Sequence, residues 1–195
     1  MTYPIVQGDH VFLRAVEMSD LDRCLRWVAD SEVTQYLLIG RFPINRLREE
    51  EWLSNLYKSQ STVHFAICKL EDSAHIGVCA LHDIDWVDRF ATLGILIGDK
   101  GHWGRGLGTE AIGLLGDYAF KVLNLNRLEL AVFDFNDRAT RSYTKLGFHS
   151  EGRLRSKRFK NGRYCDEILM GVLAPEWRIP ASTTTQDPAH SDRGA

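Results

Sequence analysis

A glycine-rich stretch at residues 101–108 constrains this chain more than any other part of its sequence. It holds four glycines in eight residues, and it lies between an apolar segment at 91–98 and a segment with helical apolar spacing. Glycine lets backbone N–H groups approach a ligand closely, and a helix N-terminus adds positive potential. The pattern predicts a strand, a phosphate-binding loop and a helix, in that order. A plain strand-to-helix turn is the alternative.

Two common phosphate-binding loops do not fit this stretch. A P-loop requires the run Gly-Lys-Ser/Thr, whereas Gly106 is followed by Leu107. A dinucleotide-binding fingerprint spaces its glycines as GxGxxG, and here Gly108 comes one residue too early after Gly104 and Gly106. The sequence thus excludes a standard nucleotide triphosphatase and disfavours a doubly wound dinucleotide fold.

The segments before the loop predict an antiparallel meander. Strands are expected at 63–70, 76–83 and 91–98, and residues 73–75 make a tight turn between the first two. The other expected elements are a strand at 11–15, a helix with a Ser19–Asp22 capping box, helices at 45–57, 109–123 and 137–146, a strand at 127–134, and a hairpin of 152–160 and 164–173 that turns at Asn161-Gly162. The predicted fold class is α/β (α+β): a mixed, mostly antiparallel sheet flanked by helices.

The apolar spacing also predicts which helix residues face inward. Gly147 is expected to end the helix at 137–146 as its C′ glycine. The inward residues are Leu21, Leu25 and Val28 in the first helix, Trp52, Leu53, Leu56 and Tyr57 in the second, and Ile112, Leu115, Ala119 and Val122 in the third.

Composition narrows the class of protein further. The chain has 195 residues, 44% of them apolar, without the run of about 18 apolar residues that a membrane span needs. Its four cysteines form no CxxC pair, which disfavours a disulfide framework or a zinc site and fits a reducing cytoplasm. Residues 1–179 are expected to form a single domain, and the polar tail at 180–195 is expected to be disordered.

The charge distribution is uneven. Residues 127–165 hold ten Lys and Arg against four Asp and Glu, although the net charge of the chain is −2. A basic half suggests an anionic ligand, with a solvated basic face as the alternative. Nucleic acid is disfavoured, because no aromatic platform or helix-turn-helix pattern accompanies the charge.

The loop and a downstream segment together resemble the GNAT superfamily of acetyl-coenzyme A-dependent N-acetyltransferases. The loop that resembles the family's pyrophosphate loop reads Trp103-Gly104-Arg105-Gly106-Leu107-Gly108, with tryptophan in place of the usual Gln or Arg. The second segment runs from Asn136 through Tyr143 to Leu146-Gly147-Phe148. Thr109-Glu110-Ala111 and the last hairpin resemble the branch that holds ribosomal-protein (alanine/serine) N-terminal acetyltransferases. The resemblance implies a sheet that splays between its fourth and fifth core strands.

The resemblance also implies a binding role for particular residues. Acetyl-coenzyme A is the implied co-substrate, without a metal. Asn136 would hold the pantetheine arm, although it equally fits an N-cap, and Arg138 and Lys145 fit either phosphate contacts or a solvated surface. The implied cofactor-binding residues are Ile95, Leu96 and Ile97 through their backbone, Trp103, Gly104, Arg105, Gly106, Leu107, Gly108 and Thr109 around the pyrophosphate, Asn136, and Arg141.

Tyr143 matches the family's general acid, and its phenol, with an unperturbed pKa near 10, is protonated at pH 7. The general base is missing from its usual place: relatives often carry glutamate where this chain has Thr92, two residues before Gly94. A hydroxyl cannot replace a carboxylate as a base. The remaining candidates are Glu110, Asp83, Asp85 and His82.

The missing carboxylate bears on the acceptor. At pH 7 roughly a tenth of a protein α-amine is already neutral, against about four in ten thousand of a lysine amine. A protein N-terminal α-amine is therefore the first expectation for the acceptor. The alternatives are a polyamine or aminoglycoside, or a non-catalytic acetyl-coenzyme A sensor.

The resemblance implies that residues 30–42 and the last hairpin select the acceptor. Tyr36, Arg41 and Phe42 are its expected wall residues. The protein is expected to be a monomer or homodimer without nucleic-acid or membrane partners. A cationic acceptor would favour an acidic wall, for which the candidates are Glu32, Asp83, Asp85 and Asp88.

Overall fold

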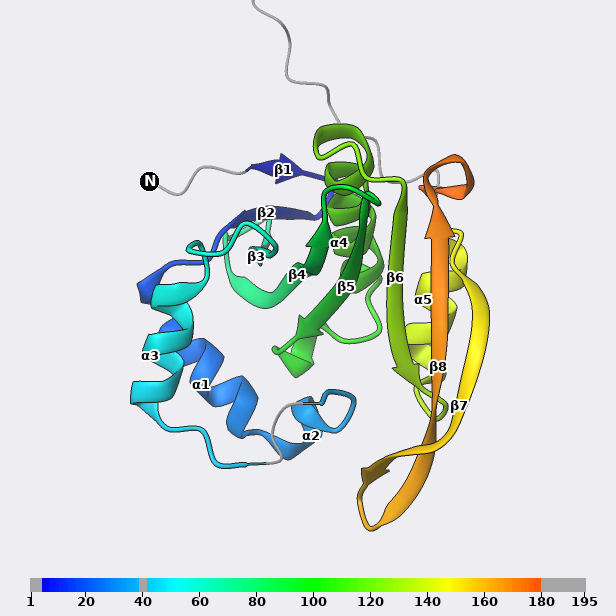
Figure 1. The fold of residues 1–195 in the computed structure, drawn as a ribbon. Coiled ribbons are helices and arrows are strands. Elements are labelled where there is room, and N and C mark those ends of the chain that lie inside the picture. Colours follow the sequence, from blue (N-terminus) through cyan, green and yellow to red (C-terminus); the bar gives the residue numbers. More distant parts are fainter. Residues whose placement is uncertain (1–4, 39–41, 180–195) are drawn as a thin grey trace, which may run out of the picture.

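One sheet organises the computed structural model of this protein, which describes residues 5–38 and 42–179 (Figure 1). Over these residues the strand order is β1-β2-β3-β4-β5-β6-β8-β7, with eight strands. Only β5 and β6 pair in parallel among them, as the expected mostly antiparallel fold requires. The strands are β1 (Val6–Gln7), β2 (Val11–Ala15), β3 (Val63–Lys69), β4 (His75–Asp85), β5 (Phe90–Ile97), β6 (Arg127–Phe133), β7 (His149–Lys160) and β8 (Arg163–Leu173).

Helices cover both faces of the sheet. Phe12, Ala66 and Cys68 pack against the α1 and α3 side, whereas the larger core joins the sheet to α4 and α5. No helix within the described ranges is long and apolar enough to cross a membrane. The helical elements are η1 (Met18–Asp20), α1 (Leu21–Ala29), α2 (Ser31–Thr34), α3 (Arg46–Asn55), η2 (Lys100–His102), α4 (Leu107–Asp117), η3 (Tyr118–Val122), α5 (Asp137–Lys145) and η4 (Ala174–Glu176).

The turn chemistry confirms two sequence predictions. Asn161 and Gly162 join β7 to β8 with φ of 50° and 78°, the left-handed pair that a two-residue hairpin needs. Gly147 has a φ of 98° directly after α5 and Leu146, the conformation expected of a C′ glycine.

Several local predictions were wrong. The first capping box joins Glu17 to Asp20, not Ser19 to Asp22, and the Asp20 carboxylate also accepts from the buried Arg14. Strand β4 already begins at His75, so the preceding turn ends earlier than predicted. In α1 the buried face is Leu21, Cys24 and Trp27, with Leu25 and Val28 half-buried.

The third predicted helix changes its winding before it ends. α4 stops at Asp117 and continues as a π-helical turn, η3. A π turn bonds i to i+5, so it shifts the helical register and turns Val122 outward, 65% exposed. In the second predicted helix, of which α3 is the helical part, Leu53 and Leu56 are buried as predicted, but Trp52 is 36% exposed and Tyr57 54% exposed.

The sheet opens where the resemblance implied. β5 and β6 pair only from Phe90 opposite Arg127 to Thr92 opposite Glu129. The two strands then separate, as Figure 1 shows in the middle of the sheet. The backbone of residues 93–97 is therefore without a ladder partner on the β6 side, while β4 still pairs with it on the other.

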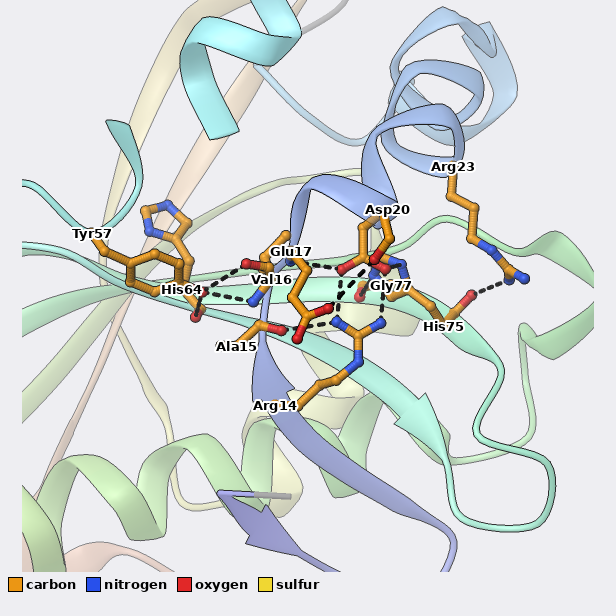
Figure 2. A network of polar contacts seen from close by, with 11 residues as sticks. Arg14, Ala15, Val16, Glu17, Asp20, Arg23, Tyr57, His64, His75 and Gly77 are labelled. Carbon is orange, nitrogen blue, oxygen red and sulfur yellow. Dashed lines mark hydrogen bonds and ion pairs between the residues drawn. The ribbon is translucent and has the colours of Figure 1, made fainter. Parts of the chain in front are cut away.

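A buried polar network fixes the junction of β2, α1 and β4 (Figure 2). Arg14 donates two hydrogen bonds of 2.7 Å to the Asp20 carboxylate, and His75 Nδ1 lies 3.0 Å from Asp20 Oδ1. His75 Nε2 donates to the carbonyl oxygen of Gly77 at 2.8 Å. This network holds α1 against the sheet, and α1 forms one wall of the cavity described next.

Candidate active site

A cavity of about 950 Å³ begins at the glycine loop, passes between the separated ends of β5 and β6, and ends under α1 and α3. Most of the predicted site residues line it. These are Ile95, Leu96, Ile97, Trp103, Gly104, Gly106, Gly108, Thr109, Asn136, Arg141 and Tyr143. The side chain of Arg105 is exposed and that of Leu107 packs toward the main core, so neither belongs to the lining.

The glycine loop has the geometry of an anion cradle. Gly104 and Gly106 have φ of 74° and 82°, and a Cβ at either position would meet no atom within 4 Å. Gly106 is the N-cap of α4, which begins at Leu107, so the loop leads directly into a helix N-terminus. Open space beside left-handed glycines fits a diphosphate that approaches the backbone.

Cationic side chains gather at the same end of the cavity. Arg138, Arg141 and Lys145 all line it from α5. The Arg138 guanidinium lies 4.7 Å from the ring centroid of Trp103, whose Nε1 donates to Ile97 O at 2.7 Å. Trp103 therefore connects the loop to β5 and packs against the Arg138 guanidinium. The positive charge at this end of the cavity favours an anionic ligand.

Asn136 takes the capping role that the sequence left open. Its side-chain oxygen accepts from the Ala139 backbone N–H at 3.2 Å at the start of α5. Asn136 is 9% exposed and also lines the cavity, so contact with a bound pantetheine arm stays a prediction.

Tyr143 lines the cavity and is 8% exposed. Burial raises the pKa of its phenol to about 12. Its ring packs against Phe148, with 5.7 Å between ring centroids. The hydroxyl thus keeps its proton at neutral pH, as a general acid must.

The structure removes three of the four candidate bases. Glu110 accepts from the backbone N–H groups of His10 and Val11 at 2.8 and 3.1 Å, so it joins α4 to β2 instead of facing the cavity. Asp83 and Asp85 belong to the end of β4 beyond the lining. His82 remains, because it does line the cavity.

The end of the cavity under α3 contains residues that the sequence did not predict. Glu49 from α3 is 6% exposed, and His64 from β3 is 7% exposed. Trp52 was predicted to face inward, and Glu49 lies one helical turn before it on the same face of the helix. This spacing could have predicted that Glu49 also faces inward. The Glu49 carboxylate and the rings of Trp52 and His64 line the cavity together with His82.

The predicted acidic wall is not where the sequence suggested. Glu32 pairs with Lys100 at 2.8 Å, and Asp85 accepts from the backbone N–H groups of Val87 and Asp88. Tyr36 lines the cavity as expected, whereas Phe42 is 75% exposed. Arg41 lies outside the described residues.

The fold and the cavity define an acyltransferase that uses coenzyme A, and comparison with known proteins agrees. Residues 10–149 match the acetyltransferase (GNAT) domain family, and the chain belongs to that family. The chain is an acetyl-coenzyme A-dependent N-acetyltransferase.

Its relatives include general and polyamine acetyltransferases. An uncharacterized N-acetyltransferase, p20, of Bacillus licheniformis is 32% identical over 87% of this chain and 96% of its own. The spermidine N(1)-acetyltransferase of Escherichia coli K12 is 37% identical over 69% of this chain and 73% of its own. The spermidine N-acetyltransferase of Vibrio cholerae, solved with CoA and spermine, superposes with a TM-score of 0.78 at 28% identity, covering 85% of this chain and 96% of the other.

The expected assignment to the ribosomal-protein branch is not specifically supported. A Bacillus subtilis protein named provisionally for ribosomal acetylation matches at 27% identity over 87% of this chain. The spermidine enzyme of Escherichia coli matches at 37%, although over 69% of the chain. The relatives therefore favour the small-molecule alternative over the protein N-terminus.

Proposed function

We propose that this protein transfers the acetyl group of acetyl-coenzyme A to a primary amine of a small polycation of the polyamine class. The observation that carries the proposal is the buried carboxylate of Glu49 inside the cavity. The spermidine acetyltransferases among the relatives support the same acceptor class.

Glu49 has no cation or hydrogen-bond donor paired with its carboxylate among the described residues. Burial raises its pKa, and the nearby charge of Arg48 only partly opposes that shift. A buried unpaired carboxylate costs stability unless a cation compensates it. An ammonium group entering the cavity provides that compensation, and a polycation brings more than one such group.

The two ends of the cavity divide the chemistry. Acetyl-coenzyme A, when bound, supplies an acetyl thioester. Gly104, Gly106 and the N-terminus of α4 would hold its diphosphate, while residues 93–97 would pair with its arm. Tyr143 would then give its phenolic proton to the departing thiolate.

A panel of amines tests the acceptor, with release of free thiol as the measurement. We expect spermidine and spermine to be acetylated at higher kcat/KM than N-terminal peptides or aminoglycosides. Preference for a peptide α-amine would overturn the polyamine assignment. Binding of acetyl-coenzyme A without turnover of any amine would instead identify a sensor.

Glu49→Gln tests the proposed amine contact. We expect KM for the polyamine to rise about 10–100-fold, the loss of a charged hydrogen bond, with the affinity for coenzyme A unchanged. We also expect the free protein to become more stable, because the substitution removes a buried unpaired charge. Glu51→Gln, on the exposed side of the same helix, is the control and changes neither quantity. An unchanged KM in Glu49→Gln contradicts the proposal.

Tyr143→Phe tests the general acid. We expect kcat to fall roughly 10–100-fold, the low end for a positioned acid, because a thiolate already leaves well. The ring and its contact with Phe148 remain, so the melting temperature and the coenzyme A affinity should stay close to wild type. Unchanged kcat under conditions where chemistry limits the rate would reduce Tyr143 to a packing residue. Tyr118→Phe, a tyrosine outside the cavity lining, is the matched control.

A protein N-terminal α-amine is the second candidate, and Thr92 is the observation that favours it. An α-amine depends less on a base, since more of it is neutral at pH 7. The comparison of peptides with polyamines above separates the two acceptors.

A further inference from the structure

A row of side chains on one face of the sheet points to a proton acceptor for the reaction. Thr92 lies directly opposite His82 in the β4–β5 ladder, so the two side chains project from the same face. Gly94, two residues further along β5, projects toward that face as well. A Cβ at Gly94 would lie 3.1 Å from His82 Nε2, so the absence of a side chain there leaves this nitrogen open to the cavity.

His82 has a second imidazole behind it. The rings of His64 and His82 meet edge to face with 5.2 Å between centroids, and the Trp52 ring packs against His64 with 5.9 Å between centroids. His64 is also fixed through its backbone, because the Tyr57 hydroxyl donates to its carbonyl oxygen at 3.2 Å (Figure 2). The two ring contacts hold the His64 imidazole between neighbouring side chains, and the hydrogen bond holds its backbone.

The pair is not satisfied by the protein itself. His64 Nδ1 is buried without a hydrogen-bond partner among the described residues, and no hydrogen bond of those residues involves either ring nitrogen of His82. A buried polar atom without a partner is costly, so such atoms usually meet water or a ligand. Both rings line the cavity, where an acceptor and its water would satisfy them.

The charge state of the pair suits this role. Burial lowers the pKa of His64 to about 4, with His82 adding to the shift, and burial also lowers the pKa of His82 against the opposing charge of Asp83. Glu49 from α3 lines the same end of the cavity. Both imidazoles are therefore neutral at pH 7 and have a lone pair free to accept a proton.

We propose that His82 accepts the proton of the acceptor ammonium group and that His64 is its positioning residue. The inference rests on the proposed N-acetyltransfer to an alkyl amine, of which only about four in ten thousand molecules are neutral at pH 7. The N–H bond of the ammonium breaks and the proton bonds to Nε2 of His82. The electron pair stays on the amine nitrogen and forms the bond to the acetyl carbon. As the C–S bond breaks, the thiolate takes the Tyr143 proton, and the second proton of the amine restores the phenol. The imidazolium then releases its proton to solvent.

The test compares amines of different basicity in His82→Gln. We expect kcat/KM for spermidine to fall about 100-fold, the low end for a general base, while a weakly basic amine such as trifluoroethylamine loses less than about threefold. His149→Gln, an exposed histidine of β7, is the control for both amines. Equal losses for the two amines would overturn the role of His82. The test of His82 compares kcat/KM of the variant with that of wild type, so it does not depend on which acceptor the wild type prefers. If the wild type prefers a peptide, only the polyamine assignment is contradicted. The strongly basic amine in the test is then a peptide in place of spermidine.

A readout without acetyl-coenzyme A keeps the test independent of turnover. The imidazole resonance of His82, assigned by its loss in His82→Gln, should shift when spermidine is added to the wild-type protein, and that of His149 should not. In His64→Gln we expect the His82 shift to shrink and kcat to fall while KM stays near wild type. An immobile His82 resonance at saturating acceptor would exclude contact with the amine and overturn the inference.

Discussion

Replacing Asp20 by asparagine is expected to lower the free energy of unfolding by about 3–5 kcal/mol, the usual cost of breaking a buried ion pair. The variant leaves the Arg14 guanidinium, 8% exposed, without its anionic partner. It also weakens the contact with His75, which is 3% exposed. For a chain of this length the melting temperature should fall by roughly 10 °C, measurable by thermal unfolding.

The effect of Asp20 depends on pH in a defined direction. Burial by itself would raise the pKa of this carboxyl, but the hydrogen bonds from Arg14 and the contact with the His75 ring outweigh it and hold the pKa well below the usual range. A carboxyl whose folded-state pKa is lowered stabilises the fold above its unfolded pKa of about 3.9, and loses that contribution as the pH falls further. The difference between wild type and Asp20→Asn should therefore be constant near neutrality and narrow below about pH 4.

Asp22→Asn is the matched control for this experiment. Asp22 pairs with Arg46, but both side chains are more than half exposed, at 66% and 58%. An exposed pair contributes less than about 1 kcal/mol. Equal losses in Asp20→Asn and Asp22→Asn would show that the buried network does not hold α1 in place.

Gly106→Val is expected to reduce the affinity for coenzyme A by more than about tenfold, or 1.4 kcal/mol, while the protein still folds. Valine is strained at a φ of 82°, and its methyl groups would fill the open space beside the loop. No atom lies within 4 Å of the Cβ position, so the core keeps its packing. Calorimetric titration with coenzyme A measures the affinity, and thermal unfolding measures the cost to the fold.

Gly162→Val separates strain from ligand binding. Gly162 has a similar φ of 78° and equally open space, but it lies at the tip of the β7–β8 hairpin, outside the cavity lining. It should lose stability like Gly106→Val and retain wild-type affinity for coenzyme A. Equal affinity in both variants would move the diphosphate site away from the glycine loop.

The sequence determined the features that depend on neighbours along the chain. The glycine loop, the helix that follows it and the Asn161-Gly162 hairpin were predictable, because positive φ and helix N-termini are local properties. The strand pattern was predictable for the same reason, since alternation of apolar residues is read within each strand. The π-helical turn at Tyr118–Val122 was not, because nothing in the local pattern distinguishes it from a continued helix.

The part of the cavity under α3 depends on long-range packing. Glu49, His64 and His82 are far apart in the sequence and come from α3, β3 and β4, so their meeting depends on sheet register and helix packing. The role of Glu110 also depends on tertiary packing. The sequence made it a candidate base, whereas in the structure its carboxylate accepts from backbone N–H groups at the start of β2. A carboxylate's role follows from its partners. The chain alone predicted the glycine loop and the helix that follows it, whereas long-range packing brought the carboxylate of Glu49 and the imidazoles of His64 and His82 to the same cavity.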